Sequence, residues 1–206
     1  MSAPQAAATT DRRGELLAIA AGLFADRGLR ATTVRDIADA AGILSGSLYH
    51  HFDSKESMVD EILRGFLDPL FERYRTIVGR GLPPRGTLEA VVIASFEAID
   101  EHNAAVAIYQ AEARRLADQP RFAYIGERLT EFRRLWHDVL SAGVADGSFR
   151  PDLDVEMSYR FLRDTVWVCV GWYRPGGKLS IDDIARQYLA IVLDGIAAPA
   201  RVDRRK

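Results

Sequence analysis

A short polar segment near the N-terminus carries the residues best suited to binding another molecule. Between Gly42 and Ser54 the chain reads ILSGSLYHHFD, in which hydroxyl, phenol and imidazole groups lie around the apolar residues Leu48 and Phe52. Such polar groups exchange hydrogen bonds with base edges and phosphate oxygens. A helix that is slim and polar on its outer face can enter a DNA major groove.

A second constellation lies about 110 residues later. Arg163 precedes Trp167 by four positions, so the two side chains share a helical face, and Tyr159 lies on the same face. This spacing favours a ligand pocket with one cationic anchor and an aromatic wall. The alternative is a salt bridge from Arg163 to a nearby carboxylate. Three aromatic residues of the middle helices are further pocket candidates, with ordinary core packing as the alternative for each: Phe96, Tyr109 and Trp136.

The sequence gives little support for a metal site, a reactive cysteine or an enzyme active site. The four histidines (50, 51, 102 and 137) do not show the spacing of a helical metal site, so no metal is expected. Cys169 is the only cysteine and lies in an apolar stretch, which predicts an inert buried thiol and a reducing compartment. Motifs of serine hydrolases, P-loops and dinucleotide-binding folds are absent, so we expect no enzyme and no cofactor. A small all-α enzyme acting on acyl thioesters remains an alternative, as does an architectural DNA-binding protein without an effector.

Composition indicates a cytoplasmic globular protein. The 206 residues are 48% hydrophobic and 27% charged, with a formal net charge of −2. No apolar run approaches the roughly 18 residues of a membrane span, and the N-terminus lacks the features of a signal peptide. Residues 1–56 contain six Lys and Arg against seven Asp and Glu, so DNA binding would depend on where cations lie rather than on net charge. Arg12, Arg13 and Lys55 are expected to hold the DNA backbone on either side of the groove.

Helical periodicity extends over nearly the whole chain and predicts an all-α fold of about nine helices. The first helix is expected from about residue 13 to residue 27, with Gly28 as its stop. Thr32 or Thr33 should cap a short second helix that ends at Gly42, and a third should run over residues 45–50. Two short helices joined by a glycine-containing turn form a helix-turn-helix. A plain helical hairpin is the alternative.

The remainder predicts a larger helical body. Ser54 should cap a long helix with a kink or break at Pro69, and residues 79–86 form a loop. Further helices are expected from residue 87, over 104–117, 121–143 and 155–173, and from Ser180 to about 196. The chain thus divides into a disordered tail (1–11), a helix-turn-helix domain (12–55), a ligand-binding and dimerisation domain (56–199) and a basic tail (200–206).

The last two helices are the expected dimer interface. Residues 165–173 are apolar almost all round, and residues 184–196 carry a similarly broad apolar surface. Such a helix is buried on more than one side, so one side can face the protomer core and the other a second protomer. The alternative is a monomer in which both are core helices. A two-fold symmetric dimer suits a palindromic DNA site.

The stretch GLRATTVRDIADAAGILSGSLYHHFDSKESMV resembles the DNA-binding region of the TetR family of transcriptional repressors. The resemblance implies an N-terminal helix-turn-helix head on a helical body that binds ligand and dimerises. It also assigns roles by position. Ser45, Gly46, Ser47 and His50 would approach base edges, whereas Thr33, Tyr49, His51 and Lys55 would contact phosphates.

Three further pieces resemble one branch of that family, the regulators of late cholesterol-ring degradation: GSLYHHFDSKE, VADGSFRPDLD and WYRPGG. This resemblance implies a homodimeric repressor that binds a palindromic double-stranded DNA operator. It further implies release by a small-molecule effector, a coenzyme A thioester of a partly degraded steroid. A drug or a fatty acyl-CoA is the alternative effector.

Overall fold

The structure is a computed structural model that describes the backbone of residues 4–194 and the side chains from residue 12 onward. Over that range the fold consists of nine α-helices and two short 3-10 helices, with no strand, which confirms the all-α prediction. The helices are α1 (Pro4–Arg27), α2 (Val34–Ala40), α3 (Ser45–Leu48), α4 (Lys55–Gly79), α5 (Pro84–Glu101), α6 (Asn103–Leu116), η1 (Pro120–Phe122), α7 (Tyr124–Ala145), α8 (Val155–Trp167), η2 (Val168–Gly171) and α9 (Ile181–Asp194).

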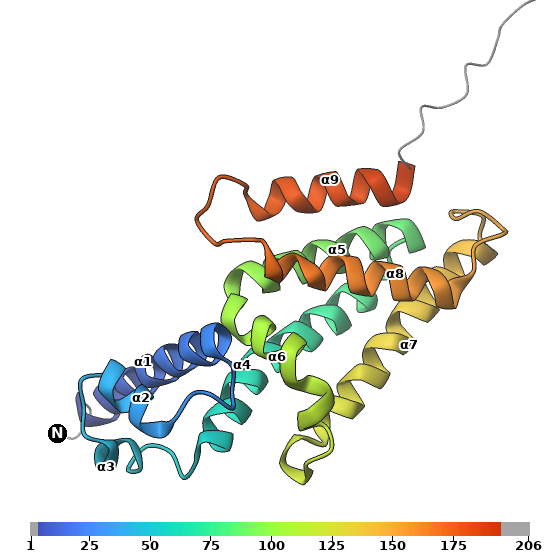
Figure 1. Cartoon of the computed structure of the whole chain (residues 1–206). Helices are drawn as coiled ribbons and strands as arrows, with labels where there is room; N and C mark the ends of the chain where they lie inside the picture. The colour runs from blue at the N-terminus through green and yellow to red at the C-terminus, as the bar shows by residue number, and fades with distance from the viewer. Residues whose placement is uncertain (1–3, 195–206) are drawn as a thin grey trace, which may run out of the picture.

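Helices α1, α2 and α3 form a small head at one end of the molecule (Figure 1). Gly28 ends α1 and Gly42 lies in the turn between α2 and α3, with φ angles of 84° and 67°. A residue with a side chain rarely adopts such angles, which explains why glycine stands at both helix ends. Thr33 begins α2 with a capping box that involves Asp36. The expected stops and cap are therefore confirmed.

Helix α1 begins earlier than predicted. It starts at Pro4 rather than near residue 13, so residues 4–11, assigned to a disordered tail, are helical in the structure. The Ala-rich sequence that follows Pro4 has high helix propensity, and proline is favoured at the first position of a helix. The basic tail expected at residues 200–206 lies outside the described residues.

Helix α4 connects the head to the body (Figure 1). Ser54 caps it through a capping box with Ser57, as the sequence suggested. A kink or a break was predicted at Pro69; α4 continues through this residue as one helix, so the break does not occur. A proline inside a helix costs about 3 kcal/mol. Burial of apolar side chains on both sides of it offsets that cost: Phe66, Leu67, Leu70 and Phe71.

The body is built around α5, which packs against α4, α7, α8 and α9. Asp154 caps α8 by accepting a hydrogen bond from the Met157 amide at 2.8 Å, as expected. Helix α8 ends at Trp167 and continues as η2, so the single helix predicted over residues 155–173 is divided. Helix α9 lies on the side of α5 away from α4 (Figure 1), whereas α8 also contacts α4 through Trp167 and Phe66. The Tyr188 hydroxyl of α9 donates to the Leu162 carbonyl of α8.

Candidate DNA-binding head and effector pocket

Helix α3 holds its outer residues on a small buried core. It spans four residues, shorter than predicted, and His51 and Phe52 continue the turn by donating their amides to the Leu48 carbonyl, both at 3.0 Å. Leu48 and Phe52 are buried, as expected. The head thus anchors the segment from inside and leaves its other side chains toward solvent.

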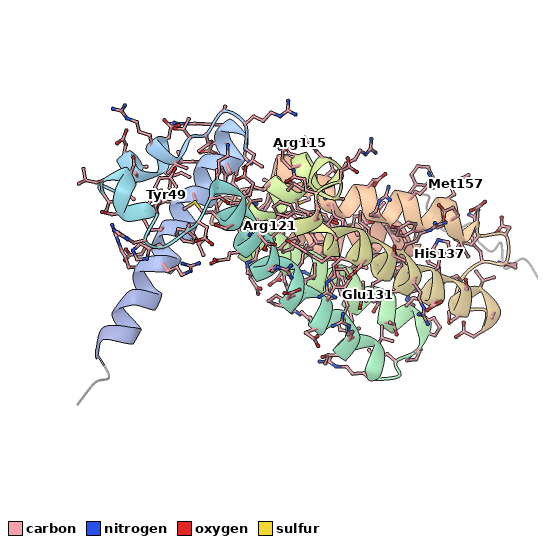
Figure 2. The ribbon with its side chains drawn as sticks, turned by 90° about the horizontal axis from the view of Figure 1, so that it is seen from below. Tyr49, Arg115, Arg121, Glu131, His137 and Met157 are labelled. Carbon is pink, nitrogen blue, oxygen red and sulfur yellow. The ribbon has the colours of Figure 1, made fainter. Side chains whose placement is uncertain are left out.

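The residues expected to meet DNA differ in exposure. Gly46, Tyr49 and His50 are exposed, Tyr49 to 57%, while Ser45, Ser47 and His51 are half-buried. Figure 2 shows Tyr49 in the head, at the opposite end of the molecule from His137 and Met157. One outer surface of the head therefore carries short polar groups together with a phenol and an imidazole.

Thr33 is exposed at the start of α2, but its hydroxyl is engaged locally. It donates to the Asp36 carboxylate at 2.6 Å and accepts from the Asp36 amide at 3.1 Å. The hydrogen bonds that the Asp36 carboxylate accepts from the Thr33 hydroxyl and the Thr33 amide hold the pKa of Asp36 below its usual range. Contact between Thr33 and a phosphate remains a prediction, and it would require the single O–H of the hydroxyl to turn from Asp36 to the phosphate, because phosphate oxygens accept hydrogen bonds.

Lys55 has an internal role that sequence reasoning missed. Its ammonium donates to the carbonyls of Leu29 at 2.6 Å and Thr32 at 3.0 Å, in the loop between α1 and α2. Lys55, the first residue of α4, thereby links this long helix to the loop between α1 and α2. An ammonium has three donors, so a contact with phosphate through the third remains a prediction.

Arg13 also stabilises the head from within. It lies inside α1, forms an ion pair with Glu61 of α4, donates to the His51 carbonyl, and stacks 4.2 Å above the Phe52 ring. Arg12 donates to Glu15 at 2.7 Å and to the Ala41 carbonyl at 3.2 Å. Both arginines lie inside α1 and have protein partners, and their contact with the DNA backbone remains a prediction.

Tyr49→Phe and His50→Ala are expected to weaken operator binding while leaving the melting temperature near that of the wild type, because both side chains are exposed. If Tyr49 contacts a phosphate, its loss weakens binding to all duplexes alike. Loss of a base contact at His50 instead relaxes discrimination at one position. Fluorescence anisotropy over a series of duplexes measures both effects. Wild-type affinity in both variants would refute the assignment of the recognition helix.

The body contains a pocket of about 440 Å³ between α4, α6, α7 and α8. Its walls are mainly apolar, and three of the predicted ligand-binding residues line it: Tyr109, Arg163 and Trp167. Trp167 packs edge-on against Phe66, with ring centroids 5.9 Å apart, and lies 6.3 Å from Phe132. Burial raises the pKa of Tyr109 to about 12, so its phenol is neutral at physiological pH. The result is an aromatic wall of fixed orientation.

Arg163 lies at the rim of this pocket. Its Nε donates to the Asp164 carboxylate at 2.6 Å, and the guanidinium lies 5.3 Å from the centre of the Tyr159 ring. The hydrogen bond to Asp164 raises the pKa of Arg163 further above its usual value. Arg163 therefore has the features of both alternatives raised by the sequence: it forms a salt bridge with Asp164, and it also lines the pocket. The ion pair uses one of the five N–H groups, which leaves others for an anion.

Three of the predicted ligand residues do not line the pocket. Phe96 is buried against Tyr188, with ring centroids 5.3 Å apart, and Trp136 is buried 5.7 Å from Phe132. Tyr159 is also buried, and its ring lies against the guanidinium of Arg163. For Phe96 and Trp136 the structure favours the alternative of ordinary core packing, because other side chains cover both on every side.

Most of the pocket wall consists of residues that the sequence pattern did not single out. It is completed by apolar residues of α4 and α7 and by two polar residues of α6: Phe66, Leu67, Leu70, Phe71, Leu129, Phe132, Gln110 and Arg114. Arg114 is exposed and makes no salt bridge with any residue that the structure describes. Gln110 and Arg114 are four apart, a spacing that could have placed them on one face with Tyr109 and Ala113.

A broad apolar surface remains uncovered on α8, η2 and α9. Its most exposed members are Met157, Phe161 at 65%, Val168 at 61% and Ile191. A second cavity of about 490 Å³ opens beside Phe161 and Ile191. A contiguous exposed apolar patch commonly marks a protein–protein interface. This surface coincides with the helices predicted to form the dimer interface.

Other sites are unremarkable over residues 4–194. The described side chains include no group of three His, Cys, Asp or Glu residues that could hold a metal ion. Cys169 is buried, and desolvation raises the pKa of its thiol to about 11, which disfavours the reactive thiolate. Among the described helices, none combines the length and apolarity that crossing a membrane requires.

Comparisons with known proteins agree with this geometry. Residues 16–62 match the model of bacterial regulatory proteins of the tetR family, and residues 81–196 match the tetracyclin repressor-like C-terminal domain. The HTH-type transcriptional repressor KstR2 of Rhodococcus jostii is 70% identical over 188 residues, which cover 91% of this chain and 92% of the relative. The solved structure of the ketosteroid transcriptional regulator KstR2 of Mycobacterium tuberculosis is 64% identical, with a TM-score of 0.87 over 91% of this chain and 96% of that chain.

The same fold occurs at much lower identity. AibR, solved with isovaleryl coenzyme A and operator DNA, is 22% identical, with a TM-score of 0.75 over 88% of this chain and 98% of that chain. At that identity the likeness is one of fold alone. The family models, by contrast, match both the head and the body of this chain.

Proposed function

Because the chain belongs to the TetR family of transcriptional regulators, we propose that it is a homodimeric repressor that binds operator DNA through its heads and is released by an effector bound in its body. The observation that carries this proposal is the course of α4. Its first residue, Lys55, holds the loop between α1 and α2, while Phe66, Leu67, Leu70 and Phe71 of the same helix line the pocket.

The coupling between the two sites is thermodynamic. An effector changes operator affinity only if it binds the operator-bound and released conformations with different affinity. Occupation of the pocket acts on α4 directly, because four of its side chains form the wall. Displacement of α4 then moves the head through Lys55 and the Arg13–Glu61 ion pair. In a dimer, the change in separation of two heads reduces their match to a palindromic site.

The effector we propose is a coenzyme A thioester of a steroid-ring fragment. A fused-ring body suits a pocket of about 440 Å³ whose wall holds Trp167, Phe66 and Phe132. Arg163 and Arg114 lie where the diphosphate of coenzyme A could reach them, and a guanidinium binds phosphate oxygens through paired N–H groups. The names of the related repressors, one of them a ketosteroid regulator, also support this chemical class.

The sequence also raised an enzyme acting on acyl thioesters. The relatives that match about nine-tenths of this chain are transcriptional repressors, so the protein is a regulator rather than an enzyme. A drug or a fatty acyl-CoA remains as an alternative occupant of the same pocket.

Selection of duplexes from a random pool, followed by thermal-shift measurements on the same sample, tests this function. We expect a palindromic duplex to be selected. A steroid-ring CoA thioester should raise the melting temperature more than its free acid, coenzyme A or palmitoyl-CoA does. Failure to enrich any duplex would contradict the repressor function. An equal or larger shift with palmitoyl-CoA would contradict the steroid assignment while leaving the repressor function standing.

A further inference from the structure

Leu44 is an exposed apolar residue in a head that otherwise buries its large apolar side chains. It is 80% exposed, while Ile37, Leu48 and Phe52 beside it are at most 4% exposed. Among the large hydrophobic residues in the described part of the head, only Tyr49 is also exposed, and Tyr49 has a polar hydroxyl. Burial in the protomer therefore does not explain the leucine at position 44.

Leu44 does not serve helix stability either. It is the N-cap residue of α3, with φ −71° and ψ 143°, and its side chain makes no capping hydrogen bond. The helices on either side begin with capping boxes, α2 at Thr33 and α4 at Ser54. Leucine is among the poorest N-cap residues, whereas serine, threonine, aspartate and asparagine are favoured. The head thus carries at this position a residue that is unfavourable for its own folding.

The position of Leu44 indicates what an apolar side chain could contact. It directly precedes Ser45 and Gly46, at the N-terminal end of the helix expected to enter the major groove. Gly46 has no side chain, and an added Cβ there would meet nothing within 4 Å, so the space beside Gly46 is open. In the major groove, the C5-methyl group of thymine is the one apolar group that base pairs present.

We propose that Leu44 is a specificity-determining residue that contacts the C5-methyl group of one thymine in each operator half-site. This inference rests on the proposed operator binding and extends it to a residue whose type carries no hydrogen-bonding group. The contact removes apolar surface of both partners from water, which is favourable without any direct hydrogen bond. Ser45 of α3 and His50 in the turn that follows it would supply polar readout, and Leu44 would add discrimination of thymine.

Deoxyuridine substitution tests this contact because it removes only the methyl group of thymine. Each thymine of the selected operator is replaced in turn, and binding is measured for the wild-type dimer, Leu44→Ala and Leu44→Ser. At one thymine per half-site we expect the substitution to weaken wild-type binding about fourfold, which is the value of one buried methyl group. Leu44→Ala should bind the unsubstituted operator at least about fourfold more weakly and should not respond to that substitution.

Leu44→Ser separates the contact from the stability of the head. A serine N-cap should raise the melting temperature above that of Leu44→Ala, while binding and deoxyuridine response stay like those of Leu44→Ala. Leu82→Ala is the matched control, since Leu82 is 40% exposed in the loop at the far end of α4. It should keep the wild-type affinity and the wild-type deoxyuridine profile.

Parallel deoxyuridine profiles of the wild type and Leu44→Ala would overturn this inference alone, because the methyl effect would then be independent of Leu44. An operator in which no thymine methyl affects wild-type binding would overturn it as well. If no duplex is bound by the wild-type dimer, the proposed function and this inference both fail.

Discussion

Replacement of Arg163 by methionine is expected to raise the dissociation constant of the effector at least about tenfold, or about 1.4 kcal/mol. Methionine keeps much of the apolar stem but removes every N–H group that could bind an anion at the rim of the pocket. The ion pair that is lost, with Asp164, is solvent-exposed, so we expect little change in stability. Calorimetric titration of the effector measures the affinity, and a thermal melt measures the stability.

Trp167→Leu should raise the dissociation constant of the effector by a similar factor, because it removes the flat aromatic ring that lies between Phe66 and Phe132. Neither residue lies in the head, so the apo variants should bind operator like the wild type. The double variant should repress without responding to the effector. Arg160→Met is the matched control, since Arg160 lies on the same helix, pairs with Glu156 and does not line the pocket.

The salt-bridge alternative for Arg163 predicts a different pattern. Under that reading Arg163→Met lowers the melting temperature and the effector still releases the operator at wild-type concentrations. A clear fall in melting temperature with an unchanged effector dissociation constant would therefore contradict the role of Arg163 in the pocket.

Phe161→Glu is expected to convert the dimer into a monomer that binds operator at least about a hundredfold more weakly. Phe161 is 65% exposed on α8, within the uncovered apolar surface, and a carboxylate there would be buried without a partner in the dimer. Two linked heads gain affinity because the second binding event is intramolecular, and a monomer loses that gain. Sedimentation velocity gives the oligomeric state, and anisotropy gives the operator affinity.

The position of the substitution matters. Val192, within the apolar surface of residues 184–196, is a poorer choice than Phe161. Its side chain is half-buried against the core of its own protomer, so a glutamate there would also destabilise the fold. Val78→Glu is the control, because Val78 is exposed on α4 beside α7 and does not line the cavity next to Phe161 and Ile191. A Phe161→Glu protein that remains a dimer, or a wild type that sediments as a monomer at micromolar concentration, would contradict the interface.

Local features of this fold were predictable from sequence, because their causes are local. The caps at Thr33, Ser54 and Asp154 each depend on a side chain and an amide three positions later. The stops at Gly28 and Gly42 depend on a backbone angle that glycine adopts easily. The resemblance to a family then supplied the arrangement of head and body, which periodicity alone could not give.

The composition of the pocket was only partly predictable. Arg163 and Trp167 are one turn apart on α8, so their common face follows from helix geometry. Whether an aromatic residue of another helix reaches the pocket depends on how helices pack against each other. Phe96 and Phe66 have equally apolar surroundings in sequence, yet only Phe66 lines the pocket.

The internal roles of Arg13 and Lys55 were not predictable for a related reason. Their acceptors are Glu61, His51, Leu29 and Thr32, which lie 23 to 48 residues away along the chain. A cation near a helix-turn-helix motif suggests a phosphate contact when the motif is read alone. Only the packing of α4 against the head reveals that protein carbonyls and a carboxylate already occupy these groups.

The central claim is that one effector molecule in the pocket of α4, α6, α7 and α8 releases the operator. The most direct measurement is titration of a preformed complex of wild-type dimer and fluorescent operator with a steroid-ring CoA thioester. We predict dissociation over the concentration range in which the thioester saturates the protein, and at least about tenfold higher concentrations for Arg163→Met. An operator that stays fully bound while a thermal shift shows the protein saturated would contradict the claim.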